Sequence, residues 1–184
     1  MIITKSLVAT QEWCVYHKSL GATKYLFLNE TSAEQTGSVY WQDTTPTSSV
    51  FSIGASGPTN STSAMIAYCF AEKQGYSKFG SYTGNGNADG PFAYTGFKPA
   101  FILIKSVSTT NWNMFDNKRS AFNVADETLW ANSSDSESTV GTSYGIDILS
   151  NGFKAKTVSS QVNNNNTVHI FMAFAEAPLV GTNN

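Results

Sequence analysis

The chain has 184 residues, enough for one domain of ordinary size with a buried core. Charged residues make up 13% of it, the formal net charge is −2 and no basic cluster occurs, so nucleic acid is not expected as a partner. No apolar run reaches the roughly 18–20 residues of a membrane-spanning helix. The first segment, "MIITKSLVAT", is too short and too strand-like for a signal peptide, so neither membrane insertion nor signal-directed export is expected.

In chain order, the predicted elements run through one series of segments and then through a similar series. The first series is "MIITKS" (1–6), "EWCVYHK" (12–18), "YLFLNET" (25–31), "SVFSIG" (49–54) and "AMIAYCFAE" (64–72). The second is "FILIKS" (101–106), "NWNMFDNK" (111–118), "TLWANSS" (128–134), "NGFKAK" (151–156) and "VHIFMAFAE" (168–176). The residue offset drifts only from 99 to 104, so the pattern indicates an internal tandem duplication.

Most of these segments are typical of strands. In "MIAYCFA", apolar side chains fall on both faces, as in strands buried from two sides of a sandwich. Loops rich in Gly, Ser, Thr and Asn separate the segments, and no helix of ten residues is predicted. We therefore expect an all-β protein, a two-layer antiparallel β-sandwich of jelly-roll or concanavalin A-like type built from the duplication.

The domain organisation follows from the same pattern. One copy could not cover its own apolar faces, so a single domain spanning 1–184 is expected. Its predicted parts are repeat one (1–74), a bridging segment (75–99), repeat two (100–178) and a C-terminal tail (179–184).

The bridging segment has no counterpart in the second series. It predicts two strands, 77–83 and 91–95, joined by a turn of Gly, Asn and Asp, and it contains six aromatic residues. We expect Tyr76, Tyr82 and Tyr94 to be partly exposed beside a partner chain or a groove, where they form a binding surface. The alternative is that these aromatic side chains cover one end of the sandwich.

The turn itself, "NGNADG", offers side-chain oxygens at Asn85, Asn87 and Asp89, in the alternation of calcium-binding loops. With one carboxylate among the three and no following Glu, the pattern predicts a weak calcium site at most. The alternative is a turn that uses Gly and Asn for its backbone conformation. No other cofactor is expected.

The two cysteines and two of the tryptophans are expected to have structural roles. Cys14 and Cys69 stand in apolar strand-like runs and are expected to be buried free thiols rather than a disulfide. Trp13 and Trp112 are matched by the repeat and are expected in the core, although aromatic platforms can also stack on sugar rings.

Catalytic patterns are weak. "GTSYG" places Ser143 in a G-x-S-x-G sequence, but a loop precedes it and a strand follows it, unlike a nucleophile elbow. Sandwich glycosidases need two carboxylates flanking a cleft, and Asp147 stands alone in its strand. Glu72 and Glu176 are matched strand ends, which favours a structural role. We expect no enzymatic activity.

Several long runs are similar to a domain of tailed-phage virion proteins, frequent in marine phages and described as a tail fibre or a domain of unknown function. They are "WCVYHKSLGATKYLFLN", "AYCFAEKQGYSKFGSYTGNGNADGPFAYTGFKPAFILIKS", "ILSNGFK" and "MAFAEAP". The resemblance covers nearly the whole chain and implies a concanavalin A-like sandwich on a virion appendage, without known catalytic residues.

These observations predict a non-enzymatic virion protein of tail-fibre or receptor-binding type whose loops attach to host surface glycans. Its expected partners are other virion proteins and host glycan, in a homo-oligomer that would be a trimer in a fibre. A capsid decoration subunit that contacts other virion proteins is the alternative, and a glycan-degrading enzyme is a disfavoured third.

Overall fold

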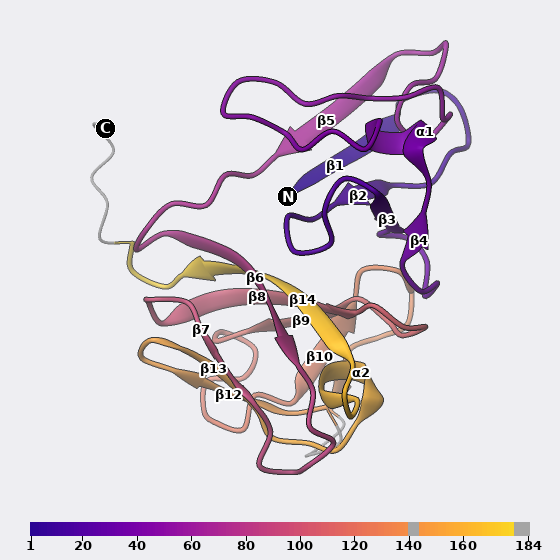
Figure 1. The fold of residues 1–184 in the computed structure, drawn as a ribbon. Coiled ribbons are helices and arrows are strands. Elements are labelled where there is room, and N and C mark those ends of the chain that lie inside the picture. The colour runs from indigo at the N-terminus through magenta and orange to yellow at the C-terminus, as the bar shows by residue number, and fades with distance from the viewer. Residues whose placement is uncertain (140–143, 179–184) are drawn as a thin grey trace. The chain divides into compact units, whose positions relative to one another are not determined.

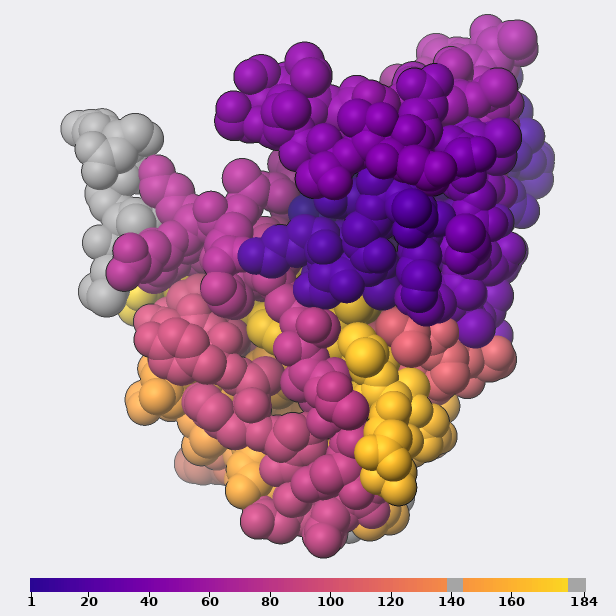
Figure 2. All heavy atoms as spheres, viewed as in Figure 1, coloured from indigo at the N-terminus to yellow at the C-terminus, as the bar shows by residue number. Residues whose placement is uncertain are grey.

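The computed structural model describes residues 1–139 and 144–178. Ser143 and the predicted tail, 179–184, lie outside these ranges. The chain divides into two compact units, unit 1 from Met1 to Ala71 and unit 2 from Glu72 onward. Whether the two units together form the predicted single domain of residues 1–184 depends on how they are arranged, so this stays a prediction. In the space-filling view, unit 1 is coloured indigo to purple and unit 2 magenta to yellow (Figure 2).

Unit 1 is one antiparallel sheet with the strand order β4-β3-β2-β1-β5 (Figure 1). Its strands are β1 (Ile2–Ser6), β2 (Cys14–Tyr16), β3 (Lys24–Phe27), β4 (Gln35–Thr36) and β5 (Met65–Cys69). A four-residue helix, α1 (Ser38–Trp41), follows β4. Its Trp41 side chain packs edge-on against Tyr16, 5.9 Å between ring centres, and belongs to the apolar cluster on one face of the sheet.

Most of the matched segments were expected to be strands, and the segment 49–54, matched with 151–156, is an exception. No strand is found there, because nearby loop and helix residues bond its backbone instead. The N–H of Gly54 donates to the carbonyl of Tyr40 (2.9 Å), and the carbonyl of Val50 accepts from the N–H of Thr47 (2.9 Å). The partner segment is a strand, so the two repeats differ here.

Unit 2 contains two antiparallel sheets, a large one with the order β11-β10-β9-β8-β14-β6 and a small one with the order β12-β13-β7. The large sheet consists of β6 (Ser77–Thr83), β8 (Pro99–Ser106), β9 (Asn113–Asp116), β10 (Glu127–Trp130), β11 (Ser138–Thr139) and β14 (Val168–Ala175). The small sheet consists of β7 (Phe92–Tyr94), β12 (Ile146–Leu149) and β13 (Gly152–Ala155). A short helix, α2 (Ser160–Asn163), is capped by the Ser159 side chain.

The two sheets of unit 2 bury an apolar core between them. Ile102, Phe115 and Phe171 of the large sheet share one cluster with Ile148 and Phe153 of the small sheet. The Phe153 and Phe171 rings meet edge-to-face, 5.2 Å apart, a favourable geometry for aromatic pairs. The prediction of an all-β, sandwich-like protein is confirmed, and the helices in the described ranges have four residues each.

Five strands of the large sheet follow the same spatial order as the five strands of unit 1, with β11, β10, β9, β8 and β14 in the places of β4, β3, β2, β1 and β5. The strand registers also agree. Ile2 lies opposite Tyr16 as Ile102 lies opposite Phe115. Val15 lies opposite Leu26 as Met114 lies opposite Leu129.

The agreement extends to a side-chain contact. The Asn29 side-chain oxygen accepts from the backbone N–H of Trp13 (2.8 Å), and Asn132 accepts from Trp112 in the same way (2.7 Å). Of these two tryptophans, Trp112 is buried as predicted, whereas Trp13 is half-buried and stacks on Tyr68.

A lysine near the end of the first strand of each series holds the loop that follows. Lys5 donates to the carbonyls of Ser6 (2.9 Å) and Ala9 (3.4 Å). Lys105 donates to the carbonyls of Ser106 (3.0 Å) and Ser108 (2.8 Å) and is fully buried. Because burial disfavours the charged form, the pKa of Lys105 is lowered to about 8.

Both cysteines are free thiols, as predicted. Cys14 is buried between strands, and burial raises the pKa of its thiol. Cys69 is exposed, so the prediction of burial is wrong for this residue. It ends β5, which has a neighbouring strand on one side among the described residues.

No helix in the described ranges, 1–139 and 144–178, has the length and apolar character needed to cross a bilayer.

Lys105 makes the stability of the protein depend on pH. The unfolded chain keeps the lysine proton up to a pKa of about 10.4, whereas the folded chain releases it near pH 8, so this group adds stability as the pH rises. The raised pKa of the buried Cys14 thiol has the opposite effect, because it lowers the free energy of unfolding as the pH rises above the usual thiol pKa of about 8.5. We therefore expect the free energy of unfolding of wild type, relative to Lys105→Met, to rise by about 1–2 kcal/mol between pH 8 and 9.5 in urea titrations.

The matched control is Lys5→Met, which removes the equivalent lysine of unit 1. This variant should keep the full pH-dependent rise relative to Lys105→Met. Parallel curves for wild type and Lys105→Met would contradict the assignment.

Candidate functional site

The aromatic residues of the bridging segment alternate between core and surface. Tyr76 and Tyr94 are 44% and 62% exposed, as expected. Tyr82 is buried, so its predicted exposure is wrong: its ring stacks on His169 and its hydroxyl donates to the carbonyl of Val162 (2.7 Å). Burial raises the pKa of this hydroxyl.

The two predicted strands of this segment exist, but they do not pair as a hairpin. β6 pairs with β14 in the large sheet, and β7 pairs with β13 in the small one. Because side chains alternate along a strand, Tyr82 points into the core between the two sheets of unit 2, whereas Phe79 is buried on the opposite face of β6 against Phe174. Much of the segment is therefore scaffold, and the three tyrosines do not form one surface.

The predicted calcium loop uses its oxygens within the chain. The Asn85 side-chain oxygen accepts from the N–H of Asn87 (2.9 Å), and that of Asn87 accepts from the N–H of Asp89 (3.0 Å). The Asp89 carboxylate pairs with Lys154 (2.6 Å), a contact that holds the pKa of Asp89 below its usual range. These residues do not fit calcium, which needs several oxygen ligands free to bind it.

The matched strand-end glutamates form ion pairs. Glu72 pairs with Lys78, and Glu176 pairs with Lys98 (2.7 Å). These ion pairs to lysines agree with the expected structural role. Glu176 also lies 3.5 Å from Lys118. Its hydrogen bond with Lys98 lowers the pKa of Glu176, so the carboxylate stays charged at neutral pH.

Glu176 is one of the residues that line a pocket of about 290 Å³ in unit 2. The lining comes from the loop after β9, from β12, from the residue before β8 and from the residue after β14. It consists of Lys98, Asn117, Ser120, Ala121, Phe122, Asn123, Ile148 and Glu176.

The amide of Asn117 is the unusual group in this pocket. Its side-chain nitrogen and oxygen are both buried, and neither has a hydrogen-bond partner within the described ranges. Unpaired buried polar atoms cost free energy, about 1–3 kcal/mol each. A ligand or water molecule that reached this amide from the pocket could satisfy both its donor and its acceptor.

The loop that carries the pocket is held at both ends. The Asp116 carboxylate accepts from the backbone N–H groups of Lys118 (2.9 Å) and Arg119 (2.8 Å), and from the Arg119 side chain (2.5 Å). At the other end, the Asn123 side chain exchanges two hydrogen bonds with the backbone of Ile148, at 2.9 and 3.1 Å. These contacts preform the pocket.

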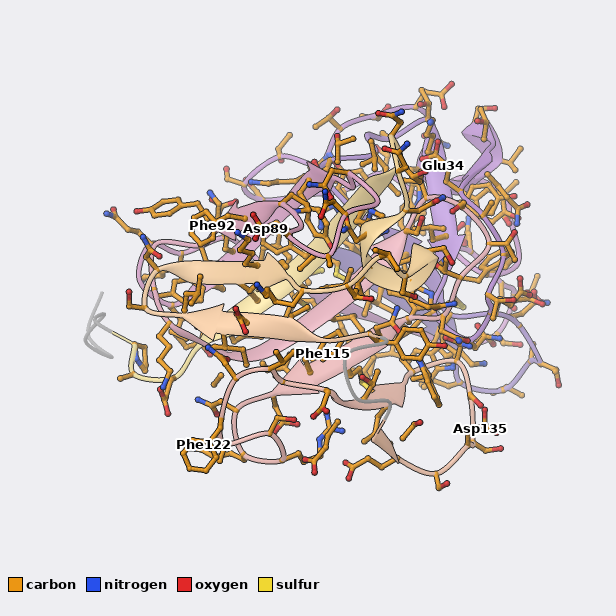
Figure 3. All side chains as sticks on the ribbon, turned by 90° about the horizontal axis from the view of Figure 1, so that it is seen from below. Glu34, Asp89, Phe92, Phe115, Phe122 and Asp135 are labelled. Carbon is orange, nitrogen blue, oxygen red and sulfur yellow. The ribbon has the colours of Figure 1, made fainter. Side chains whose placement is uncertain are left out.

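Phe122 lies between these anchors and is 87% exposed. Figure 3 shows its ring on a peripheral loop, pointing away from the sheets, in contrast to Phe115 between the strands. A single exposed apolar side chain is common on a protein surface, so Phe122 is of interest because it also lines the Asn117 pocket.

The sequence analysis missed this site, although one signal pointed to it. The offset between equivalent residues is 99 at Tyr16 and Phe115 but 103 at Lys24 and Glu127. Four extra residues therefore lie between β9 and β10, in the loop that contains Asn117 and Phe122. A loop that is longer in one of two matching series of strands can carry a function without disturbing the strands.

A larger pocket of about 850 Å³ is lined in part by Asp89, Tyr144 and Lys156. Its carboxylate, Asp89, already pairs with Lys154. The Asn117 pocket is the stronger candidate because it contains an amide without a hydrogen-bond partner in the described ranges.

A family model described as "Domain of unknown function (DUF7483)" matches residues 1–178. The chain belongs to this family. No curated protein and no solved structure matches it. The family match spans both units and includes the Asn117 pocket.

The different surroundings of Tyr82 and Tyr94 lead to a stability prediction. Tyr82→Phe removes the partner of a buried carbonyl and should lower the free energy of unfolding by about 1–2 kcal/mol. Tyr94→Phe is the control and should change it by less than about 0.5 kcal/mol, because the residue is exposed. Equal effects in urea denaturation would contradict the burial of Tyr82.

Proposed function

We propose that the protein is a non-enzymatic attachment domain of a tailed-phage virion, of tail-fibre or receptor-binding type, which binds host surface glycans. The observation that carries the proposal is the unpartnered Asn117 amide in a preformed pocket beside the exposed Phe122 ring. The virion setting rests on the resemblance in sequence.

The chemistry of the pocket suits a sugar. A sugar hydroxyl both donates and accepts hydrogen bonds, as the Asn117 amide does, and neighbouring hydroxyls can bind the charged Glu176 and Lys98. The C–H face of a sugar ring can cover the apolar face of Phe122. Pockets of this kind combine one apolar surface with a few placed polar groups.

The fold agrees with this function. We infer that the five-strand framework arose by tandem duplication, and the shared strand order, strand registers and Asn–Trp contacts support this inference. A jelly-roll or concanavalin A-like sandwich remains our proposal for the whole chain. In such a framework the repeated strands supply rigidity, and the loops carry recognition.

A capsid decoration subunit is the second candidate. The open edge of β5 in unit 1 favours it, because a strand edge is a surface for protein rather than for sugar.

Glycan binding can be tested with immobilised bacterial lipopolysaccharides and capsular polysaccharides. The full chain should bind a subset of them, and Asn117→Ala and Phe122→Ala should each weaken binding at least about tenfold, the loss expected for one good contact. The control Phe92→Ala removes another exposed ring and should leave binding unchanged.

Melting temperatures of the variants separate loss of binding from unfolding, and both pocket variants should melt within a few degrees of wild type. Wild-type binding that survives both substitutions would place recognition elsewhere. A chain that binds no glycan but coats isolated capsids would favour the decoration role.

A further inference from the structure

β5 is bonded to β1 through alternate residues. The N–H of Phe70 donates to the carbonyl of Met1 (2.9 Å), and the N–H of Leu7 donates to the carbonyl of Ala64 (2.9 Å). In an antiparallel pair, residues that bond to a neighbour recur at every second position. Ile66 and Tyr68, which lie between these two bonded positions, therefore direct their backbone groups toward β1.

The residues between them face the other way. Met65, Ala67 and Cys69 direct their N–H and C=O groups toward the outer edge of β5, and no described strand pairs with that edge. Three residues thus present a continuous row of donors and acceptors.

Unit 2 shows what occupies the equivalent edge. Next to β14, which takes the place of β5, lies β6. The carbonyl of Thr167 accepts from Gly84 (2.9 Å) and the N–H of Ala175 donates to Tyr76 (2.8 Å), so the odd-numbered residues of β14 bond to β6. His169, Phe171 and Ala173 are the equivalents of Met65, Ala67 and Cys69, because they lie opposite the same positions of the central strand.

Other sheet edges in the described ranges are protected. β4 and β11 have two residues each, β7 has three, β6 contains Lys78 and β12 contains Asp147. β5 has five residues with no charge and no proline, and its Tyr68 side chain is 42% exposed. Long, uncharged edges are the ones that pair with another strand.

We propose that β5 pairs with β5 of a second copy of this chain, antiparallel, about a twofold axis at Ala67. In this register Ala67 lies opposite its own counterpart, and Met65 lies opposite Cys69 of the second copy. The outward backbone groups then meet in three hydrogen-bonded pairs, about six hydrogen bonds in all.

The side chains of β5 suit self-pairing. Ile66 would lie opposite Tyr68 of the second copy on both sides of the axis, a pair of β-branched and aromatic residues that stabilises sheets. No charge meets a like charge. A twofold contact pairs the outer β5 edge of one copy with the outer β5 edge of the other. No β5 edge then remains unpaired, so assembly stops at a dimer and does not continue into a filament. This inference does not depend on glycan binding.

The first test is the mass of the full chain in solution across a concentration series, by light scattering after gel filtration. Wild type should be a dimer at high concentration. Ala67→Pro removes an outward N–H and should raise the dimer dissociation constant at least about tenfold without unfolding the chain, because proline is tolerated where an edge N–H faces solvent.

Ala67→Lys places a charge at the axis and should have the same effect if proline disturbs the strand. Val8→Lys is the charge-matched control at another exposed position of unit 1, and it should dimerise like wild type. A monomeric wild type, or a dimer unchanged by both Ala67 variants, would overturn the proposal. So would a trimer, which this twofold contact does not produce.

The second test is the strand register. Opposite residues of a hydrogen-bonded pair have Cα atoms about 5.5 Å apart, within reach of a disulfide. Ala67→Cys in a Cys69→Ser background should therefore form a covalent dimer on mild oxidation, and Val8→Cys in the same background should not. Equal cross-linking at both positions would overturn the proposed axis.

Discussion

The structure depends on how backbone hydrogen bonds alternate along β5 and β14, the last strands of the two matching series. In unit 2 the even-numbered residues of β14 bond to β8 and the odd-numbered ones to β6, so β14 has a paired strand on each side. In unit 1 the same geometry satisfies one side of β5 and leaves the other open. The last strand of the series is therefore an interior strand of the sheet in unit 2 and an edge strand in unit 1.

The two units surround this framework differently. Unit 2 covers one face of its large sheet with β7, β12 and β13, which form a second layer. Unit 1 fills its core with Trp41 from a four-residue helix. The repeated strands preserve hydrogen bonds and core packing, whereas the insertion between β9 and β10 carries the pocket of Asn117. Both proposed binding surfaces thus lie where the two matching series of strands differ.

The sequence predicts the matched strands well, because period-2 patterns and the repeat agree at each of them. It fails where tertiary context decides. The exposure of Tyr82 depends on which strand pairs with β6, a long-range choice that no local pattern contains. Segment 49–54 resembles its partner in sequence, but its backbone bonds elsewhere. The Asn117 amide is unremarkable in sequence, since its significance comes from the lack of a partner in three dimensions.

Residue-resolved amide hydrogen exchange of the full chain tests the shared framework most directly. The amides of His169, Phe171 and Ala173 should be protected at every protein concentration, because β6 lies in the same chain. Those of Met65, Ala67 and Cys69 should exchange rapidly in dilute solution and become protected only as the concentration rises. Protection of Ala67 that is independent of concentration, or rapid exchange at Phe171, would contradict the account.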